Sequence, residues 1–270
     1  TQDAVHLRRS IRTVAKNKDL WLANAEANAG MIKHDVSELW RDGMGLPGVI
    51  AAAGPSLDVD VSDLEKHVSS GAELCVVDAS VKYFLSRDIV PDYCVTSDAS
   101  PKVKDFIGGV GASKTKLIAN VIIDPEIARS WPGDIYWFIM MNQYHDGDKN
   151  QMIQDMHTRA TKVNGKLIPG GNVSSVALSF MLSVRNSKDL RLYGFDFCWK
   201  TNMYAGKMHA QRQSERMRDE GESGTIYDDK NTVGEPVKTN LSLRRYADWH
   251  RDALNRNRIR VTNVTGSTII

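Results

Sequence analysis

The sequence Val49-Ile50-Ala51-Ala52-Ala53, which runs directly into the turn Gly54-Pro55-Ser56, decides the fold class. An unbroken apolar run of this kind is typical of a strand that is buried on both faces of a parallel sheet. Further apolar runs occupy residues 74–77, 93–96, 116–123, 135–140, 190–193 and 259–264, and helix-like stretches separate them. This alternation predicts an α/β fold, Rossmann-like and doubly wound, with a mostly parallel sheet.

The composition is that of a globular protein with one large domain. The 270 residues are 41% hydrophobic and 25% charged, and their formal charge is +2. This near-neutral balance gives no reason to expect a nucleic-acid or membrane-surface partner, and the sequence shows neither a membrane span nor a signal peptide. Cys75, Cys94 and Cys198 lie in apolar runs without metal-ligand spacing, which indicates reduced cysteines and a cytoplasmic protein.

The pattern along the chain predicts one sheet domain with two additions. Residues 1–45 carry apolar residues at helical spacing and are expected to form an N-terminal helical arm. Residues 46–270 would form the Rossmann-like domain, in which 241–270 supply a closing helix and strand. Within that domain, residues 199–240 are polar and weakly periodic. Such long segments in compact domains are typically lids or disordered, and we expect a lid over the site here.

Two glycine turns are placed where such a sheet binds ligands, at the carboxyl ends of its strands. The first is Gly54-Pro55-Ser56, and the second, Gly170-Gly171-Asn172-Val173-Ser174, opens a helix. Glycine lets the backbone approach a ligand closely, and amides at a helix start can bind an anion. The first turn fits a plain strand-to-helix connection equally well, and Asn172 fits an N-cap. Neither turn matches G-x-G-x-x-G or the P-loop, which weakens a dehydrogenase or a P-loop NTPase.

Acidic residues follow three of the predicted strands. Asp78 and Asp98 come after the runs at 74–77 and 93–96, where they can hydrogen-bond a ribose, sugar or base, or position a metal ion. Asp196 is flanked by Phe195 and Phe197, which favours a buried structural acid.

Four segments, taken in order, resemble a known superfamily. They are Ala53-Gly54-Pro55-Ser56-Leu57, Val90-Pro91-Asp92-Tyr93 with Ser97-Asp98, Gly170-Gly171-Asn172-Val173, and Tyr193-Gly194-Phe195-Asp196-Phe197. They are similar to the MptE-like 6-hydroxymethylpterin pyrophosphokinases, the motility accessory factors (flagellin glycosyltransferases) and the bacterial sialyltransferases of the Campylobacter type. The tail, which contains Tyr204-Ala205-Gly206-Lys207-Met208-His209-Ala210, looks most like the motility accessory factors.

The resemblance implies activated-sugar chemistry with a CMP-linked nonulosonic acid as the donor. It places Asp98 on the sugar or acceptor side as a catalytic residue. The residues that it implies for binding the nucleotide and its phosphate are Gly54, Pro55, Ser56, Asp78, Gly170, Gly171, Asn172, Ser174 and Lys207.

Two further residues of the tail are implied to act in catalysis. Tyr204 falls where the sialyltransferases place a phenol on the departing phosphate, and a donor there stabilises developing charge. His209 is the candidate base, although a lone loop histidine is more often a solvated surface residue. The sequence departs from the sialyltransferase pattern at two points, because Cys198 replaces an aromatic residue and residues 237–240 contain no histidine.

Two other functions stay open. The first is ATP- and Mg²⁺-dependent pyrophosphoryl transfer to a hydroxymethyl-dihydropterin, in which Asp78 and Asp98 would hold Mg²⁺. Mg²⁺ is therefore a possible cofactor, and the sequence makes no cofactor certain. A non-catalytic nucleotide-binding module would explain the absent histidine. The expected partner is a nucleotide or nucleotide sugar, with a protein or glycan acceptor for the sugar transferase, and neither nucleic acid nor a membrane.

Overall fold

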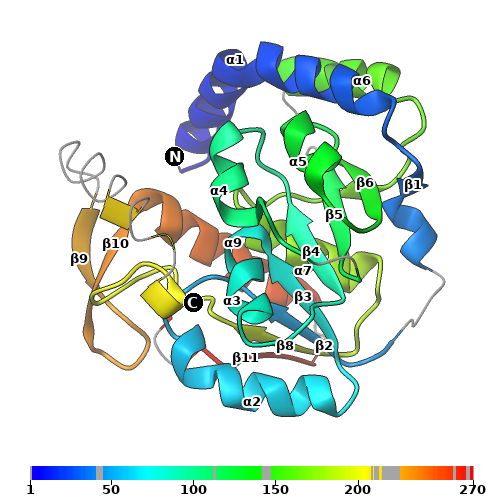
Figure 1. The fold of residues 1–270 in the computed structure, drawn as a ribbon. Helices are drawn as coiled ribbons and strands as arrows, with labels where there is room; N and C mark the ends of the chain where they lie inside the picture. Colours follow the sequence, from blue (N-terminus) through cyan, green and yellow to red (C-terminus); the bar gives the residue numbers. More distant parts are fainter. Residues whose placement is uncertain are drawn as a thin grey trace.

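The computed structural model describes residues 2–40, 45–111, 114–141, 147–207, 209, 213–214, 226–257, 260–265 and 268–269. Within these residues the main sheet has nine strands (Figure 1). They are β1 (His34–Asp35), β2 (Gly48–Ala51), β3 (Glu73–Val77), β4 (Tyr93–Thr96), β5 (Lys116–Asn120), β6 (Ile135–Met140), β7 (Lys166–Leu167), β8 (Asp189–Tyr193) and β11 (Arg260–Asn263).

The strand order is β1-β6-β5-β4-β3-β2-β8-β11, with β7 paired to β6 outside this path. All of these pairs are parallel, and Ile50 of β2 lies in register with Cys75 of β3 and Leu192 of β8. The chain moves one way from β2 to β6 and then returns to the other side of β2 for β8 and β11. The gap between β2 and β8 is therefore the topological switch point, where doubly wound sheets bind their ligands.

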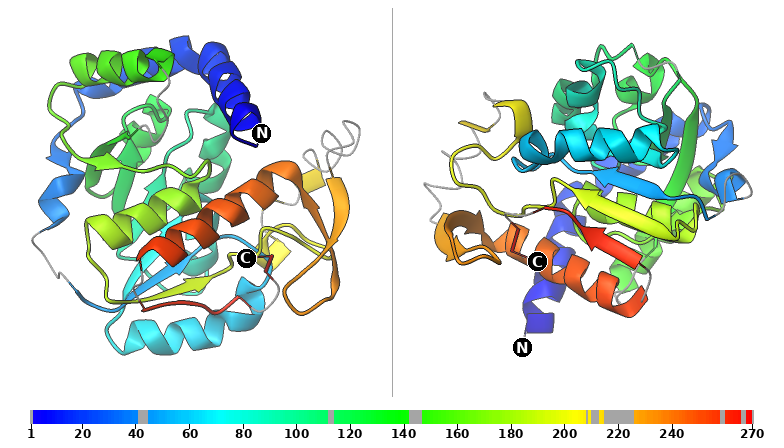
Figure 2. Two further views of the ribbon diagram at one scale, coloured as in Figure 1. Left: turned by 180° about the vertical axis from the view of Figure 1, so that it is seen from behind. Right: turned by 90° about the horizontal axis from the view of Figure 1, so that it is seen from below.

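Helices cover both faces of the sheet, which confirms the predicted α/β class. The longer ones are α1 (Gln2–Ala29), α2 (Leu57–Ser69), α6 (Gly147–Arg159), α7 (Val173–Ser183) and α9 (Leu241–Asn257), and the shorter ones are α3 (Val81–Leu85), α4 (Lys104–Ile107) and α5 (Pro125–Ser130). Short 3₁₀ turns are η1 (Val36–Trp40), η2 (Asp78–Ser80), η3 (Pro101–Val103) and η4 (Ala205–Lys207). Helices α3 and α4 lie in front of the sheet in Figure 1, whereas α7 and α9 lie side by side in front of it in the reverse view of Figure 2.

The core explains why the strands read as continuous apolar runs. Every residue of β2 and β4 is buried, and so are the last four residues of β3 and of β5. The apolar run at 116–123 is longer than β5, which ends at Asn120, because residues 121–123 are buried as well. The carbonyl groups of these three residues accept hydrogen bonds from α1. Asn28 Nδ2 donates to Val121 O and Ile123 O, each at 2.9 Å, and Asn24 Nδ2 donates to Ile122 O at 2.9 Å.

The N-terminal arm is only partly helical. Helix α1 ends at Ala29, and His34–Asp35 then form β1, which extends the sheet beside β6. Asp35 fixes this edge because its carboxylate accepts hydrogen bonds from the Gly165 amide, at 3.0 and 3.1 Å, and from the Ser37 amide. The prediction of a helical arm over 1–45 is therefore wrong for residues 34–35, and residues 1 and 41–44 lie outside the described residues.

The polar segment 199–240 contains two longer described parts, besides residues 209 and 213–214. Residues 199–207, which we call the strap, run beside the carboxyl ends of the strands, where the Ala205 amide donates to Ala53 O at 3.1 Å. Strands β9 (Ile226–Lys230) and β10 (Pro236–Asn240) form an antiparallel hairpin. An isolated bridge joins Trp199 to Lys238. Residues 208, 210–212 and 215–225 lie outside the described residues, and closure of this segment over a ligand stays a prediction.

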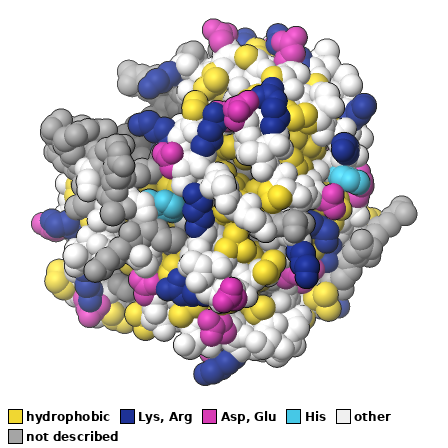
Figure 3. Space-filling model, viewed as in Figure 1, with side chains coloured by type: hydrophobic (Ala, Val, Ile, Leu, Met, Phe, Trp, Pro, Cys, Tyr) yellow, Lys and Arg dark blue, Asp and Glu magenta, His cyan; other side chains and the backbone are white. Residues whose placement is uncertain are grey.

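The surface agrees with the near-neutral balance of the sequence. On the face seen in Figure 3, lysine and arginine side chains alternate with aspartate and glutamate and do not gather into a patch of one sign. Among the helices of the described residues, none is long and apolar enough to cross a membrane.

Candidate functional site

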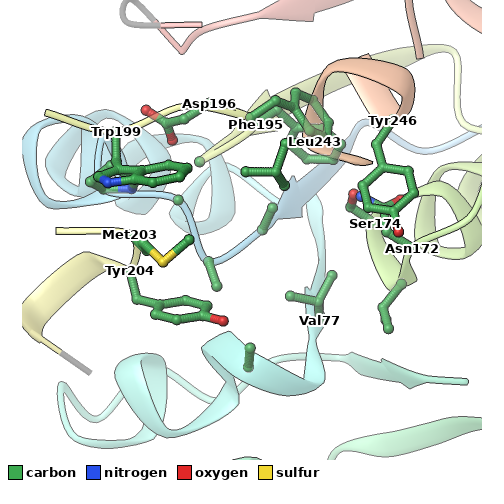
Figure 4. A pocket seen from close by; sticks show the side chains of 18 of the residues that line it. Val77, Asn172, Ser174, Phe195, Asp196, Trp199, Met203, Tyr204, Leu243 and Tyr246 are labelled. Carbon is green, nitrogen blue, oxygen red and sulfur yellow. The ribbon is translucent and has the colours of Figure 1, made fainter. Parts of the chain in front are cut away.

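A cavity of about 440 Å³ opens at the switch point (Figure 4). Its floor is made by the segments that follow β2, β3 and β8, one wall by the start of α7, and the opposite wall by the strap. The lining residues are Ala52, Ala53, Gly54, Pro55, Val77, Asp78, Ala79, Asp98, Phe106, Gly171, Asn172, Val173, Ser174, Gly194, Phe195, Asp196, Phe197, Cys198, Trp199, Met203, Tyr204, Leu243 and Tyr246. The structure thus brings most of the sequence-predicted site residues together.

The first glycine turn is built onto Asp196. The Ser56 hydroxyl donates to Asp196 Oδ2 at 2.9 Å and the Ser56 amide donates to Oδ1 at 3.3 Å, while the Gly54 amide donates to Gly194 O at 3.0 Å. A Cβ atom on Gly54 would overlap both the Asp196 carboxylate and the Gly194 carbonyl. Gly54 and Pro55 line the cavity, whereas the Ser56 side chain faces Asp196.

Asp196 has both a structural and a cavity-lining position. Its side chain is 2% exposed, and this burial raises its pKa to about 7, although the hydrogen bonds from Ser56 act in the opposite direction. The structure supports the predicted structural acid, since Asp196 braces the Gly54–Ser56 turn. Asp196 follows a predicted strand and so was expected at the ligand-binding edge of the sheet, but its two phenylalanine neighbours favoured a structural role and it was not among the predicted binding residues.

Asp78 and Asp98 reach the same cavity in different ways. Asp78 is buried, and its carboxylate accepts hydrogen bonds from the Ala79 amide at 2.7 Å and the Thr96 hydroxyl at 2.9 Å. Asp98 is exposed, and its carboxylate accepts from the Ser100 amide at 2.9 Å. Among the described residues, no three His, Cys, Asp or Glu side chains form a group that could hold a metal ion. Two carboxylates at one cavity still fit Mg²⁺, because this ion is usually held by one or two carboxylates together with substrate phosphates and water.

The second glycine turn places the N-terminus of α7 against the cavity. Asn172 is the N-cap, with its Oδ1 accepting from the Ser175 amide at 3.1 Å, so the predicted cap is confirmed. Gly171 has φ of +101° and lies under the Tyr246 ring, and Gly170 lies under the Trp249 ring. Gly171, Asn172 and Ser174 line the cavity, and the partial positive charge of a helix N-terminus there favours an anion.

The strap supplies an aromatic cluster at the opposite wall. The Tyr204 ring lies 6.4 Å from Phe106 and 5.5 Å from His209, centroid to centroid, and the Tyr204 hydroxyl points into the cavity (Figure 4). His209 packs on Phe106 at 4.4 Å, and its Nε2 lies 2.8 Å from Ala79 O. Since a carbonyl oxygen only accepts, Nε2 carries the proton, and a role as base would fall to Nδ1. Lys207 ends η4, and its side chain lies outside the described residues.

The described wall of the cavity is acidic, and two of its three acids, Asp78 and Asp98, were predicted at the site. Among the described residues, the charged side chains that line it are Asp78, Asp98 and Asp196, without a lysine or arginine. The aromatic lining residues Trp199 and Tyr246 were not among the predicted site residues, because in the sequence Trp199 fits the core or a pocket wall and Tyr246 lies in a predicted helix. An anionic ligand would therefore be held on these residues by backbone amides and hydroxyl groups.

Comparisons with known proteins place this chain in a family. No curated protein matches the chain. Among solved structures, the MAf glycosyltransferase from Magnetospirillum magneticum AMB-1 has the same fold, with a TM-score of 0.61 and 14% sequence identity. The match covers 93% of this chain and 37% of that one, so this chain spans well under half the length of its structural relative. The family model described as "6-hydroxymethylpterin diphosphokinase MptE-like" matches residues 21–202, which is more than half of the chain. The predicted resemblance to the MptE-like proteins and the motility accessory factors is thereby confirmed, whereas the likeness to sialyltransferases stays a prediction. The protein belongs to the MptE-like family.

Proposed function

We propose that the protein is a nucleotide-dependent transferase that moves a sugar from an activated donor, with a CMP-linked nonulosonic acid as that donor. The observation that carries the proposal is the cavity at the switch point, where the start of α7 faces the Tyr204 phenol across the strand ends. The fold shared with a MAf glycosyltransferase supports it. The likeness to sialyltransferases, which rests on the sequence alone, supplies the CMP donor.

The two walls suggest how the transfer would proceed. The bond between the sugar carbon and the phosphate oxygen breaks, and an acceptor hydroxyl oxygen forms the new bond to that carbon. Charge then develops on the departing phosphate, which the α7 amides and the Tyr204 hydroxyl are placed to stabilise. Asp98 is exposed at the cavity and can accept the proton that the acceptor hydroxyl loses. His209 Nδ1 is the alternative base.

A thermal-shift and calorimetric screen against CMP, CDP, UDP, GDP and ATP tests the donor. We expect the cytidine nucleotides to bind and to raise the melting temperature, because binding to the native state alone stabilises it. Indifference to cytidine nucleotides would overturn the donor assignment. Binding of CMP without turnover of any CMP-linked sugar and acceptor, protein or glycan, would favour the non-catalytic nucleotide-binding module instead.

The second candidate function is ATP-dependent pyrophosphoryl transfer to a hydroxymethyl-dihydropterin. It is favoured by the family description and by the two carboxylates, Asp78 and Asp98, at one cavity. These residues would hold Mg²⁺, which would neutralise charge on the transferred phosphates. Release of AMP on mixing the pterin, ATP and Mg²⁺ would support this function over sugar transfer, and its loss in Asp78→Asn would connect the activity to this cavity.

A further inference from the structure

One contact joins the second glycine turn to a buried ring on α9. The Ser174 Oγ atom, at the cavity wall, lies 3.5 Å from His250 Nε2. His250 is fully buried, and its ring is packed by Phe195, Phe197 and Trp249 at centroid distances of 5.4, 4.9 and 5.1 Å. Because no face of this ring reaches solvent, its two nitrogen atoms depend on partners within the protein.

The other nitrogen of the ring fixes where the proton lies. His250 Nδ1 is 2.7 Å from Tyr246 O, and a carbonyl oxygen can only accept, so Nδ1 carries the hydrogen. Burial lowers the pKa of His250 to about 4, although the backbone oxygens of Tyr246 and Ser174 partly offset this. The ring is therefore neutral near pH 7, and its single hydrogen lies on Nδ1. Nε2 then presents a lone pair, which the Ser174 backbone oxygen cannot satisfy because a carbonyl oxygen is itself only an acceptor.

The lone pair on Nε2 determines which way the Ser174 hydroxyl points. A buried acceptor without a donor destabilises the protein, so the single Ser174 proton is directed at Nε2. The neighbouring Ser175 cannot replace it, because the Ser175 hydroxyl donates to Asn172 O at 2.5 Å and accepts from the Gly170 amide. What Ser174 offers to the cavity is then an oxygen with lone pairs, which an ionised phosphate oxygen cannot use.

We propose that His250 is a positioning residue that makes Ser174 a hydrogen-bond acceptor toward the cavity, so that this point of the site selects an N–H or O–H group of the ligand. An amino group of a base or a hydroxyl group of a ribose or sugar has this chemistry, and a phosphate oxygen does not. The inference rests on the proposed function in that it takes the cavity to be the ligand site. It revises the predicted role of Ser174 in holding the anion, which passes to the backbone amides of the turn.

The first test is independent of any ligand. Nitrogen-detected NMR of the histidine rings in the free protein is expected to show His250 with a protonated Nδ1 and a bare Nε2, whose shift changes in Ser174→Ala. Ser183→Ala on the same helix is the matched control and should leave the ring unchanged, since its hydroxyl donates to Ser179 O. A protonated Nε2, or no response to Ser174→Ala, would overturn the proposal.

The second test uses inorganic phosphate as the probe, in wild type, Ser174→Ala, His250→Phe and the double variant. In the wild-type background Ser174→Ala should change the phosphate Kd by less than about twofold, because the hydroxyl does not donate to the anion. In His250→Phe the hydroxyl is released, and its removal should weaken phosphate binding on the order of tenfold. An equal loss in both backgrounds would overturn the proposal. Absence of phosphate binding in every variant would count against the anion site of the proposed function, while the NMR result would still decide this inference.

Discussion

The two glycine turns line one cavity, but the first is held by a buried carboxylate and the second is packed against neutral aromatic rings. The Gly54–Ser56 turn rests on a carboxylate, Asp196, which takes both the amide and the hydroxyl hydrogen of Ser56. The Gly170–Ser174 turn rests on neutral rings, with Trp249 and Tyr246 over its glycines and His250 beside its serine. Donor groups of the first turn are therefore already used inside the protein, whereas the second turn has a helix N-terminus directed at the cavity. The difference teaches that a glycine turn at a strand end predicts an anion site only when no acid lies behind it.

The largest expected difference between the two turns is the loss of stability when a methyl group is added to a glycine of each. Gly54→Ala would overlap the Asp196 carboxylate and the Gly194 backbone carbonyl, neither of which can move easily, and should reduce the free energy of unfolding by about 5 kcal/mol. Gly170→Ala meets the ring of Trp249, a side chain that can shift, and should cost about 2 kcal/mol. Denaturant unfolding of both variants measures the difference, and equal losses would contradict the idea that only the first turn is rigidly braced.

Removing the ionisable group behind the first turn should change the pH dependence of stability. The pKa of Asp196 is raised from 3.8 to about 7, so between these values the unfolded chain releases a proton that the native state keeps. Stability is therefore lost as the pH rises through this window, by up to about 4 kcal/mol, and Asp196→Asn should remove that slope. Unfolding free energies measured from pH 4 to pH 8 would show it. The same flattening in the exposed Asp98→Asn variant would contradict an origin in Asp196.

The buried base behind the second turn should act in the opposite direction. The pKa of His250 is lowered from 6.5 to about 4, so the unfolded chain binds a proton that the native state does not bind. Stability is lost as the pH falls from about 6.5 to 4, by about 3 kcal/mol, and His250→Phe should remove this loss. The readout is the slope of unfolding free energy against pH in the same series. If His250→Phe and Asp196→Asn changed the slope of unfolding free energy against pH in the same direction, the contrast between the two turns would be contradicted.

Removing the Tyr204 hydroxyl from the cavity wall opposite the second turn should lower the turnover rate more than the stability. Tyr204→Phe keeps the ring contacts with Phe106 and His209 but removes the hydroxyl that points into the cavity. With the proposed donor we expect turnover to fall on the order of a hundredfold with little change in melting temperature. Tyr227→Phe, at an exposed tyrosine of β9, is the matched control. An unchanged turnover in Tyr204→Phe would remove the phenol from the mechanism.

The smallest effect concerns the cap of the second turn. Asn172→Ala removes the acceptor of the Ser175 amide and should lower the free energy of unfolding by about 1 kcal/mol. Asn172→Ser retains a capping oxygen and should recover most of that loss. Chemical denaturation of the two variants decides whether Asn172 contributes as a cap. A full loss in both variants would show that its amide has another role.

The sequence predicts the sheet well and the cavity wall only partly. Runs such as 74–77 and 93–96 are buried on both faces, and this constraint is visible in each run alone. The two-residue strand β1 and the hairpin β9–β10 lack such runs. Strand β1 is fixed instead by hydrogen bonds between the Asp35 carboxylate and the Gly165 amide, far away in the chain. The predicted contributions of Gly54 and Asn172 followed from local rules. The buried, structural character of Asp196 followed from its phenylalanine neighbours. Its bond to Ser56 and the contact of His250 with Ser174 join residues far apart in the chain, and no local pattern indicates them.

The bond between Ser56 and Asp196 also bears on the order of folding, since it joins residues 140 positions apart. Contacts this distant require a long loop to close and form slowly compared with local ones. The strands from β2 to β6 follow one another along the chain, so their pairing does not have to wait for β8. The cavity floor would then be completed only when β8 docks beside β2, late in folding. Weakening this contact should accordingly speed unfolding more than it slows folding, which makes Asp196 a determinant of how long the native site persists.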